Sequence, residues 1–136
     1  MQGRTTKATR PTRTSSARSR RVRTIAAFVE EYLVVHQSEG HSQKTLEWHT
    51  TSLGLLVGFL EAQGVTDPLE CETSHLREWV VWLGTTESVK RRPGRTSVSP
   101  RSKRTIHTYT RSAHAFCKWL HDEGYIAVDV TDGNGL

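Results

Sequence analysis

The chain has few cysteines and no long apolar run. Its 136 residues include only Cys71 and Cys117, which are too few for a disulfide framework, so we expect a reducing compartment. No apolar segment approaches the roughly 18 residues that a membrane-spanning helix needs, and the N-terminus has no hydrophobic stretch like that of a secretion signal. These absences predict a cytoplasmic protein. The length predicts one domain, since a chain of this size buries enough apolar surface to fold without disulfide bonds or metal ions.

Acidic residues are missing from two segments that hold most of the positive charge. Residues 1–23 contain eight lysines and arginines and residues 89–104 contain seven, which is fifteen of the nineteen in the chain. Residues 24–88 carry ten acids against only Lys44 and Arg77, a net charge of −8 for that segment. The overall charge of +5 therefore hides a strong asymmetry, and a polyanionic partner would meet particular surfaces.

Residues 1–23 also have almost no large apolar side chains and are rich in arginine, threonine and serine. Such a segment cannot bury enough surface to offset the entropy of ordering, so we expect a disordered basic arm that tracks DNA. A solvated leader and an organellar transit peptide are the alternatives, but the segment lacks the amphipathic spacing of a transit peptide.

Four segments within residues 24–128 repeat apolar residues at helical spacing between helix start and stop signals. The predicted helices start at Thr24, at Ser42, at Thr73 or Ser74, and at Ser99 or Ser102, and their stops are Gly40, Gly64, Gly84 and Gly124. Residues 85–100 contain two prolines, a glycine and most of the second basic block, and are predicted to form an extended mobile loop. We expect an all-α bundle of four to five helices without a sheet.

The fourth predicted helix has two opposite faces. Ile106, Tyr109, Ala113, Phe116 and Leu120 form an apolar stripe, and the opposite sector carries Lys103, Arg104, His107, Arg111, His114 and Lys118. A charged face is usually only solvated, but this one has no acid to pair with its cations. That pattern favours an anionic partner.

Two stretches resemble the N-terminal SAM-like, or core-binding, domain of tyrosine recombinases and phage integrases. The first is Ser42-Gln43-Lys44-Thr45-Leu46-Glu47-Trp48-His49, and the second runs from Arg104 to Ile126 as RTIHTYTRSAHAFCKWLHDEGYI. The resemblance covers residues 24 to about 128. The chain departs from the family pattern at His49, where a tyrosine is usual, at Ser112 or Ala113, where a leucine is frequent, and after Gly124, where Asn-Pro is common.

The resemblance implies a DNA-binding domain that clamps duplex DNA during integration and recombination. In the family a C-terminal catalytic domain lies on the other face of the duplex and supplies the tyrosine nucleophile. We expect this chain not to be an enzyme by itself, residues 129–136 to be a tail or linker to such a catalytic domain, and the partners to be duplex DNA and other recombinase protomers. A bacterial or phage-encoded, nucleoid-associated protein is implied.

Phosphate binding needs cations, hydroxyl groups and helix N-terminal amides along a groove, and the second and fourth predicted helices offer all three at their starts. Gln43, Arg104 and Arg111 suit base edges, whereas Lys44, Lys103 and Thr105 suit phosphates. The predicted DNA-binding residues are Ser42, Gln43, Lys44, Thr45, Arg91, Arg92, Arg101, Ser102, Lys103, Arg104, Thr105, His107, Thr108 and Arg111.

Three other interpretations compete with DNA binding. A helical protein-interaction module would dock through Trp48, Leu55, Phe59, Trp79 and Trp82. A zinc site could use Cys71, His75, His114, Cys117 and His121, but buried cysteines and surface histidines explain that set better, so we expect no metal and no cofactor. A free-standing enzyme would need a nucleophile, a base and an orienting group in a recognisable set, and none is present.

Overall fold

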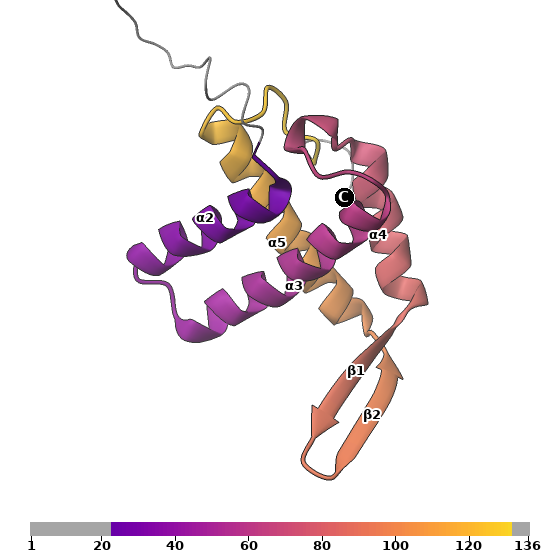
Figure 1. Cartoon of the computed structure of the whole chain (residues 1–136). Coiled ribbons are helices and arrows are strands. Elements are labelled where there is room, and N and C mark those ends of the chain that lie inside the picture. The colour runs from indigo at the N-terminus through magenta and orange to yellow at the C-terminus, as the bar shows by residue number, and fades with distance from the viewer. Residues whose placement is uncertain (1–22, 132–136) are drawn as a thin grey trace, which may run out of the picture.

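The computed structural model describes residues 23–131, which form four α-helices and one β-hairpin (Figure 1). The helices are α2 (Ile25–Ser38), α3 (Gln43–Ala62), α4 (Thr73–Thr85) and α5 (Lys103–Asp122), with a 3-10 helix, η2, at Pro68–Glu70, and the strands are β1 (Glu87–Arg92) and β2 (Arg95–Pro100). Most of the predicted basic arm (1–22) and most of the predicted tail (132–136) lie outside the described residues, as do the side chains of Lys90, Arg91 and Arg92.

Three of the helices begin at the hydroxyl residues that the sequence indicates. The side-chain oxygens of Thr24, Ser42 and Ser102 accept hydrogen bonds from the amides three residues ahead, each at 3.1 Å. These caps satisfy amides that have no partner inside the helix. The predicted ends are also confirmed, because Gly40, Gly64 and Gly124 follow α2, α3 and α5.

The predicted bounds of α4 were wrong at both ends. Its N-cap is Glu72 rather than Thr73 or Ser74, and the Glu72 amide donates to His75 Nδ1 at 2.9 Å in a capping box. Thr73 is used otherwise, since its hydroxyl donates to the Val130 carbonyl at 2.6 Å. Gly84 lies inside the helix, which continues to Thr85.

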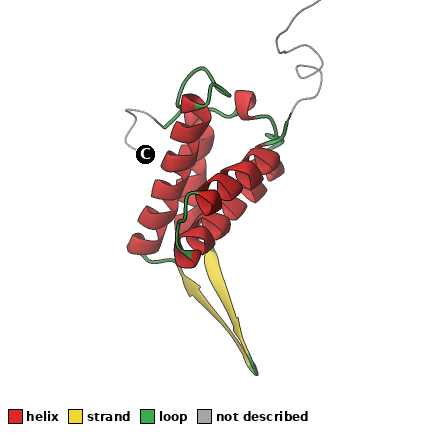
Figure 2. Ribbon diagram, turned by 90° about the vertical axis from the view of Figure 1, so that its left-hand side faces the viewer, coloured by secondary structure: helices red, strands yellow, loops and turns green. Residues whose placement is uncertain are grey.

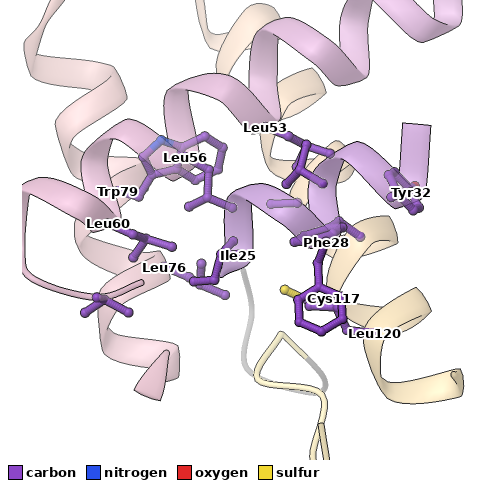
Figure 3. Close-up of a cluster of buried hydrophobic side chains, with 14 of the residues drawn as sticks. Ile25, Phe28, Tyr32, Leu53, Leu56, Leu60, Leu76, Trp79, Cys117 and Leu120 are labelled. Atoms are coloured by element: carbon purple, nitrogen blue, oxygen red, sulfur yellow. The ribbon is translucent and has the colours of Figure 1, made fainter. Parts of the chain in front are cut away.

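The four helices surround one apolar core, part of which Figure 3 shows. α3 crosses α5 in the centre of the molecule and also packs against α2 and α4. The apolar stripe of α5 is confirmed, with Ala113, Phe116 and Leu120 at most 3% exposed and Ile106 and Tyr109 packed against the core. None of the described helices has the length and apolarity needed to cross a membrane.

Residues 87–100 form an antiparallel hairpin, so the expectation of a loop and of a fold without a sheet was wrong. Glu87 pairs with Pro100 and Arg92 with Arg95, which leaves Pro93 and Gly94 as the two-residue turn, with Gly94 at a φ of +76°. Val89 faces Val98 across the strands, and both are about half exposed. The hairpin projects from the bundle without a core beneath it (Figure 2).

Both ends of the described chain are packed against the domain. Arg23 donates to Glu31 at 2.6 Å, and its guanidinium lies 4.1 Å from the centre of the Phe28 ring. At the other end Thr131 is fully buried and donates twice to the Asp129 carboxylate. The packed domain therefore includes Arg23 and residues 129–131, which the sequence-based boundaries assigned to the arm and the tail.

Candidate nucleic-acid interface

α3 and α5 begin with the same local structure. Each starts with the pattern Ser-x-x-Thr, in which the serine hydroxyl donates to the threonine hydroxyl, at 2.9 Å between Ser42 and Thr45 and at 3.0 Å between Ser102 and Thr105. Neither first turn contains an acid, and each contains an exposed cation, Lys44 in one and Arg104 in the other. Both helix starts therefore combine the positive end of the helix dipole with a mobile positive charge.

An open groove of about 490 Å³ lies between the N-terminal half of α3 and the outer face of α5. None of the described residues that line this groove carries a carboxylate. The positive charge comes from Arg104 and Arg111. The lining residues are Thr45, Trp48 and His49 from α3 and Arg104, His107, Thr108, Arg111, Ser112 and Ala115 from α5.

The floor of this groove is neutral and fixed. His49 Nδ1 and Ser112 Oγ are hydrogen-bonded at 3.0 Å where the two helices cross, and Ser112 is buried. Burial lowers the pKa of His49, and the nearby His36 and His41 lower it further, so the imidazole is uncharged at neutral pH. The groove thus presents its charge at the rim and hydrogen-bonding side chains below it.

A second hollow lies on the other side of α5, against α4. It too has no carboxylate in its lining, which consists of Arg77, Val80, Lys103, Ile106, His107, Thr110, Arg111 and His114. His107 and Arg111 line both hollows, so they form a ridge between them. The outer face of α5 therefore carries a cationic ridge with a depression on each side.

The cations of α5 differ in whether a protein carboxylate already neutralises them. Lys118 pairs with Asp122 at 2.7 Å near the end of the helix, so the expectation that this face has no acid to pair with its cations was wrong for Lys118. Lys103, Arg104 and Arg111 have no ion pair with any carboxylate of residues 23–131. An external anion can therefore bind these three without displacing a protein group.

Arg101 has a structural role that its sequence position does not indicate. Its Nη1 donates to the Thr86 hydroxyl at 2.6 Å, to the Thr86 carbonyl at 3.2 Å and to the Leu83 carbonyl at 3.3 Å. The guanidinium also lies 5.4 Å from the centre of the Trp82 ring. These contacts join the end of α4 to the residue that follows β2, so Arg101 fixes the base of the hairpin.

The structure gathers part of the predicted DNA-binding set on one surface. Thr45, Arg104, His107, Thr108 and Arg111 line the groove, and Lys103 lies in the neighbouring hollow. Ser42, Gln43 and Lys44 are exposed at the start of α3, beyond the groove lining. The hydroxyls of Ser102 and Thr105 bond to each other, while the side chains of Arg91 and Arg92 lie outside the described part of the chain.

Sequence reasoning missed two contributors to this surface. Trp48 lines the groove and is 51% exposed, with Lys44 Nζ 6.0 Å from the ring centre. The sequence analysis instead assigned Trp48 to the docking surface of the alternative protein-interaction module. Arg77 is in α4, far along the chain in an acidic segment, and no local pattern connects it to α5.

The cysteine and histidine residues considered for zinc do not come together. Cys117 is 5% exposed within the core, and burial raises its pKa. Cys71 is partly buried, and burial raises its pKa to about 11. His75 uses Nδ1 to cap α4, and within residues 23–131 no three of the five candidates form a ligand group. The thiolate form that a cysteine needs in order to bind zinc is disfavoured at both cysteines.

No protein-family model, no curated protein and no solved structure matches the chain. The functional argument accordingly depends on the geometry and charge of the surface described above.

Proposed function

We propose that this domain binds duplex DNA through the outer face of α5 and the start of α3. The observation that carries the proposal is the groove lined by Arg104, His107, Thr108 and Arg111 from α5 and by Thr45 from α3, without a carboxylate. Nucleic-acid phosphates are the abundant polyanion that such a surface suits, because binding releases condensed counterions. The shape of α5 agrees, since an exposed α-helix fits the major groove of B-DNA.

In the proposed complex, different residues of this surface contact the bases and the phosphates of the duplex. Arg104 and Arg111 are seven residues apart, about 10 Å along the helix, which is close to the width of the major groove. In this proposal Arg111, at the centre of the ridge, contacts one base edge, and Gln43 of α3 contacts another. Lys44, Lys103 and Thr105 at the helix starts suit the phosphates on either side.

We further propose that the domain acts as the core-binding part of a tyrosine recombinase. The support is the resemblance of residues 24–128, together with a helical fold in which the two stretches that carry it, one at the start of α3 and one covering almost all of α5, border one groove. In that function the domain would hold one face of the duplex while a catalytic domain acts from the other.

The surface required by a protein-interaction module is largely covered. Trp79 is fully buried, and Phe59 packs against Trp82 with 5.7 Å between ring centres. Leu55 is packed against the core as well, which leaves Trp48 as the one strongly exposed member of that set. Trp48 lines the cationic groove, so its exposed ring belongs to the surface proposed for DNA.

Fluorescence anisotropy with a labelled duplex over a range of salt concentrations tests the proposal. If about five phosphates are contacted, log K falls with log salt at a slope of about −4.5. Lys103→Glu and Arg104→Glu weaken binding to every duplex and flatten this slope. Lys118→Glu is the matched control, because it makes the same charge change on the same helix at a residue paired with Asp122.

Two further comparisons separate base contacts from phosphate contacts. Arg111→Ala costs about 1 to 3 kcal/mol on a preferred sequence and less on a scrambled one if Arg111 contacts a base. Deleting residues 1–22 removes seven cations and no acid while retaining Arg23, and lowers the affinity through charge alone. Negligible binding at low salt, or Lys103→Glu and Arg104→Glu variants that bind as tightly as the unmodified chain, would show that this surface is not a DNA interface.

A further inference from the structure

The turn between α2 and α3 brings two histidines together by its backbone geometry. Gly40 has a φ of +83°, and the His41 amide donates to the His36 carbonyl at 3.2 Å while the Gly40 amide donates to the Gln37 carbonyl at 3.1 Å. This pair of bonds is the Schellman motif, which normally sets two apolar side chains in contact at the outer positions. Here those positions hold His36 and His41, whose ring centres are 4.3 Å apart.

Glu39 completes a group of three potential metal ligands at this turn. Its Oε1 lies 3.5 Å from His41 Nε2, and the ligand atoms offered by Glu39, His36 and His41 all lie within 4.8 Å of one another. A tetrahedral zinc ion with bonds of about 2.0 Å to nitrogen and oxygen places its ligand atoms about 3.3 Å apart. One pair already has this spacing. Glu39 and His41 are 59% and 38% exposed, so their side chains have room to rotate.

His36 is the fixed member of the group and has an unmet polar atom. The edge-on ring of Tyr32 at 4.2 Å and the stacked ring of His49 at 5.0 Å hold its imidazole in place. Its Nδ1 is buried and has no hydrogen-bond partner among the described residues. A buried polar atom without a partner is uncommon in folded proteins and calls for a water or an ion near the ring.

We propose that His36, Glu39 and His41 bind a divalent transition-metal ion, with zinc as the expected occupant. Two imidazoles and one carboxylate suit zinc and its borderline neighbours, whereas calcium and magnesium prefer oxygen ligands alone. Three protein ligands leave at least one coordination position for water or another small ligand. The site spans the end of α2 and the residue before the α3 N-cap, so the ion joins the two helices.

Zinc titration of the full chain, without a histidine tag and after treatment with a chelator, tests the proposal. Isothermal titration is expected to give one site, and excess zinc is expected to raise the melting temperature because the ion binds only the folded turn. Zinc-induced shifts of the ring nitrogens in NMR spectra are expected for His36 and His41. Glu39→Gln and His41→Gln, both at exposed side chains, each lower the affinity at least tenfold and abolish the thermal shift.

Matched controls distinguish this site from the other histidines and cysteines. His121→Gln removes an exposed histidine at the end of another helix and is expected to leave zinc affinity unchanged. Cys117→Ser tests the separate cysteine set and is also expected to have no effect. Absence of saturable zinc binding at micromolar concentrations overturns the proposal. Unchanged zinc affinity in the Glu39→Gln, His41→Gln double variant also overturns the proposal. Loss of zinc binding in either control, with a native circular dichroism spectrum, has the same consequence.

Discussion

Ser112 Oγ and His49 Nδ1 form a 3.0 Å hydrogen bond that joins α5 to α3 across 63 residues of sequence. At His49 the recombinase pattern usually has a tyrosine, and at Ser112 or the next residue it often has a leucine. A polar pair therefore occupies the point where the two helices meet, at positions where the sequence departs from that pattern. Both residues also line the cationic groove, so the bond links its two walls.

The substitution Ser112→Ala is expected to lower the free energy of unfolding by about 1 to 3 kcal/mol. The reason is that Ser112 is buried and His49 is half-buried, so the imidazole nitrogen loses its partner without gaining full access to water. Urea denaturation followed by circular dichroism measures the change. Ser97→Ala on the exposed strand β2 is the control and stays within about 0.5 kcal/mol of the unmodified chain. An equal, small effect of both substitutions would mean that the bond contributes nothing.

Arg101→Lys separates a structural arginine from a DNA-binding one. The substitution keeps the charge but removes the planar guanidinium, whose Nη1 donates to Leu83 and Thr86 and whose plane lies near the Trp82 ring, so the free energy of unfolding falls by about 2 kcal/mol. The salt dependence of DNA binding is expected to stay the same. Arg104→Lys is the matched control, three residues further on at an exposed side chain, and leaves stability unchanged. If Arg101→Lys is as stable as Arg104→Lys, the assignment of Arg101 to the hairpin base is wrong.

Stability is expected to fall at acidic pH through Glu31. Burial raises the pKa of this carboxyl, but hydrogen bonds from Arg23 and Tyr125 and the Arg23 charge outweigh burial, so its pKa is below the ordinary value. The stabilisation is therefore complete above the usual glutamate range, about pH 4.3, and is lost as the pH falls through the lower value in the folded state.

Glu31→Gln tests this linkage. Since Arg23 and Glu31 are 38% and 33% exposed, solvent screens the pair, and the loss at pH 7 is about 1 kcal/mol. Unfolding free energies measured from pH 7 down to the acid limit are expected to converge for the two proteins. Glu30→Gln, an exposed neighbour, keeps the pH dependence of the unmodified chain. Curves that stay parallel at all pH values would show that Glu31 is not the responsible group.

The sequence predicts the helices well because their signals are local. Thr24, Ser42 and Ser102 cap helices within three residues of themselves, and the apolar stripe of α5 marks its buried face. The hairpin was missed because the prolines, the glycine and the charges of residues 85–100 were given more weight than the two-residue turn at Pro93 and Gly94. Val89 opposite Val98 is the alternation that would have revealed it.

The candidate interface could be predicted only in part for a similar reason. Periodicity locates the cationic side of α5, but it does not show what stands beside that side. Arg77 and Trp48 border it because α4 and α3 pack on either flank, which is a tertiary relationship. Arg101 shows the opposite case, since its local charge pattern favours DNA binding while its tertiary contacts give it a structural use.

Alanine substitutions at Gly40 and Gly58 are expected to change stability in opposite directions. An added Cβ meets no atom within 4 Å at either position, so steric overlap with neighbours cannot account for a difference. Gly40 has a φ of +83°, where an L-residue is strained, and Gly40→Ala lowers the free energy of unfolding by about 1 to 2 kcal/mol. Gly58 lies within α3, where alanine has a higher helix propensity than glycine. Gly58→Ala therefore raises the free energy of unfolding by about 1 kcal/mol. Denaturation in the presence of a chelator keeps any ion at the turn from contributing. Gly40→Asn, which tolerates this backbone conformation better, is expected to recover part of the loss, and changes of the same sign for Gly40→Ala and Gly58→Ala would contradict this account of the turn.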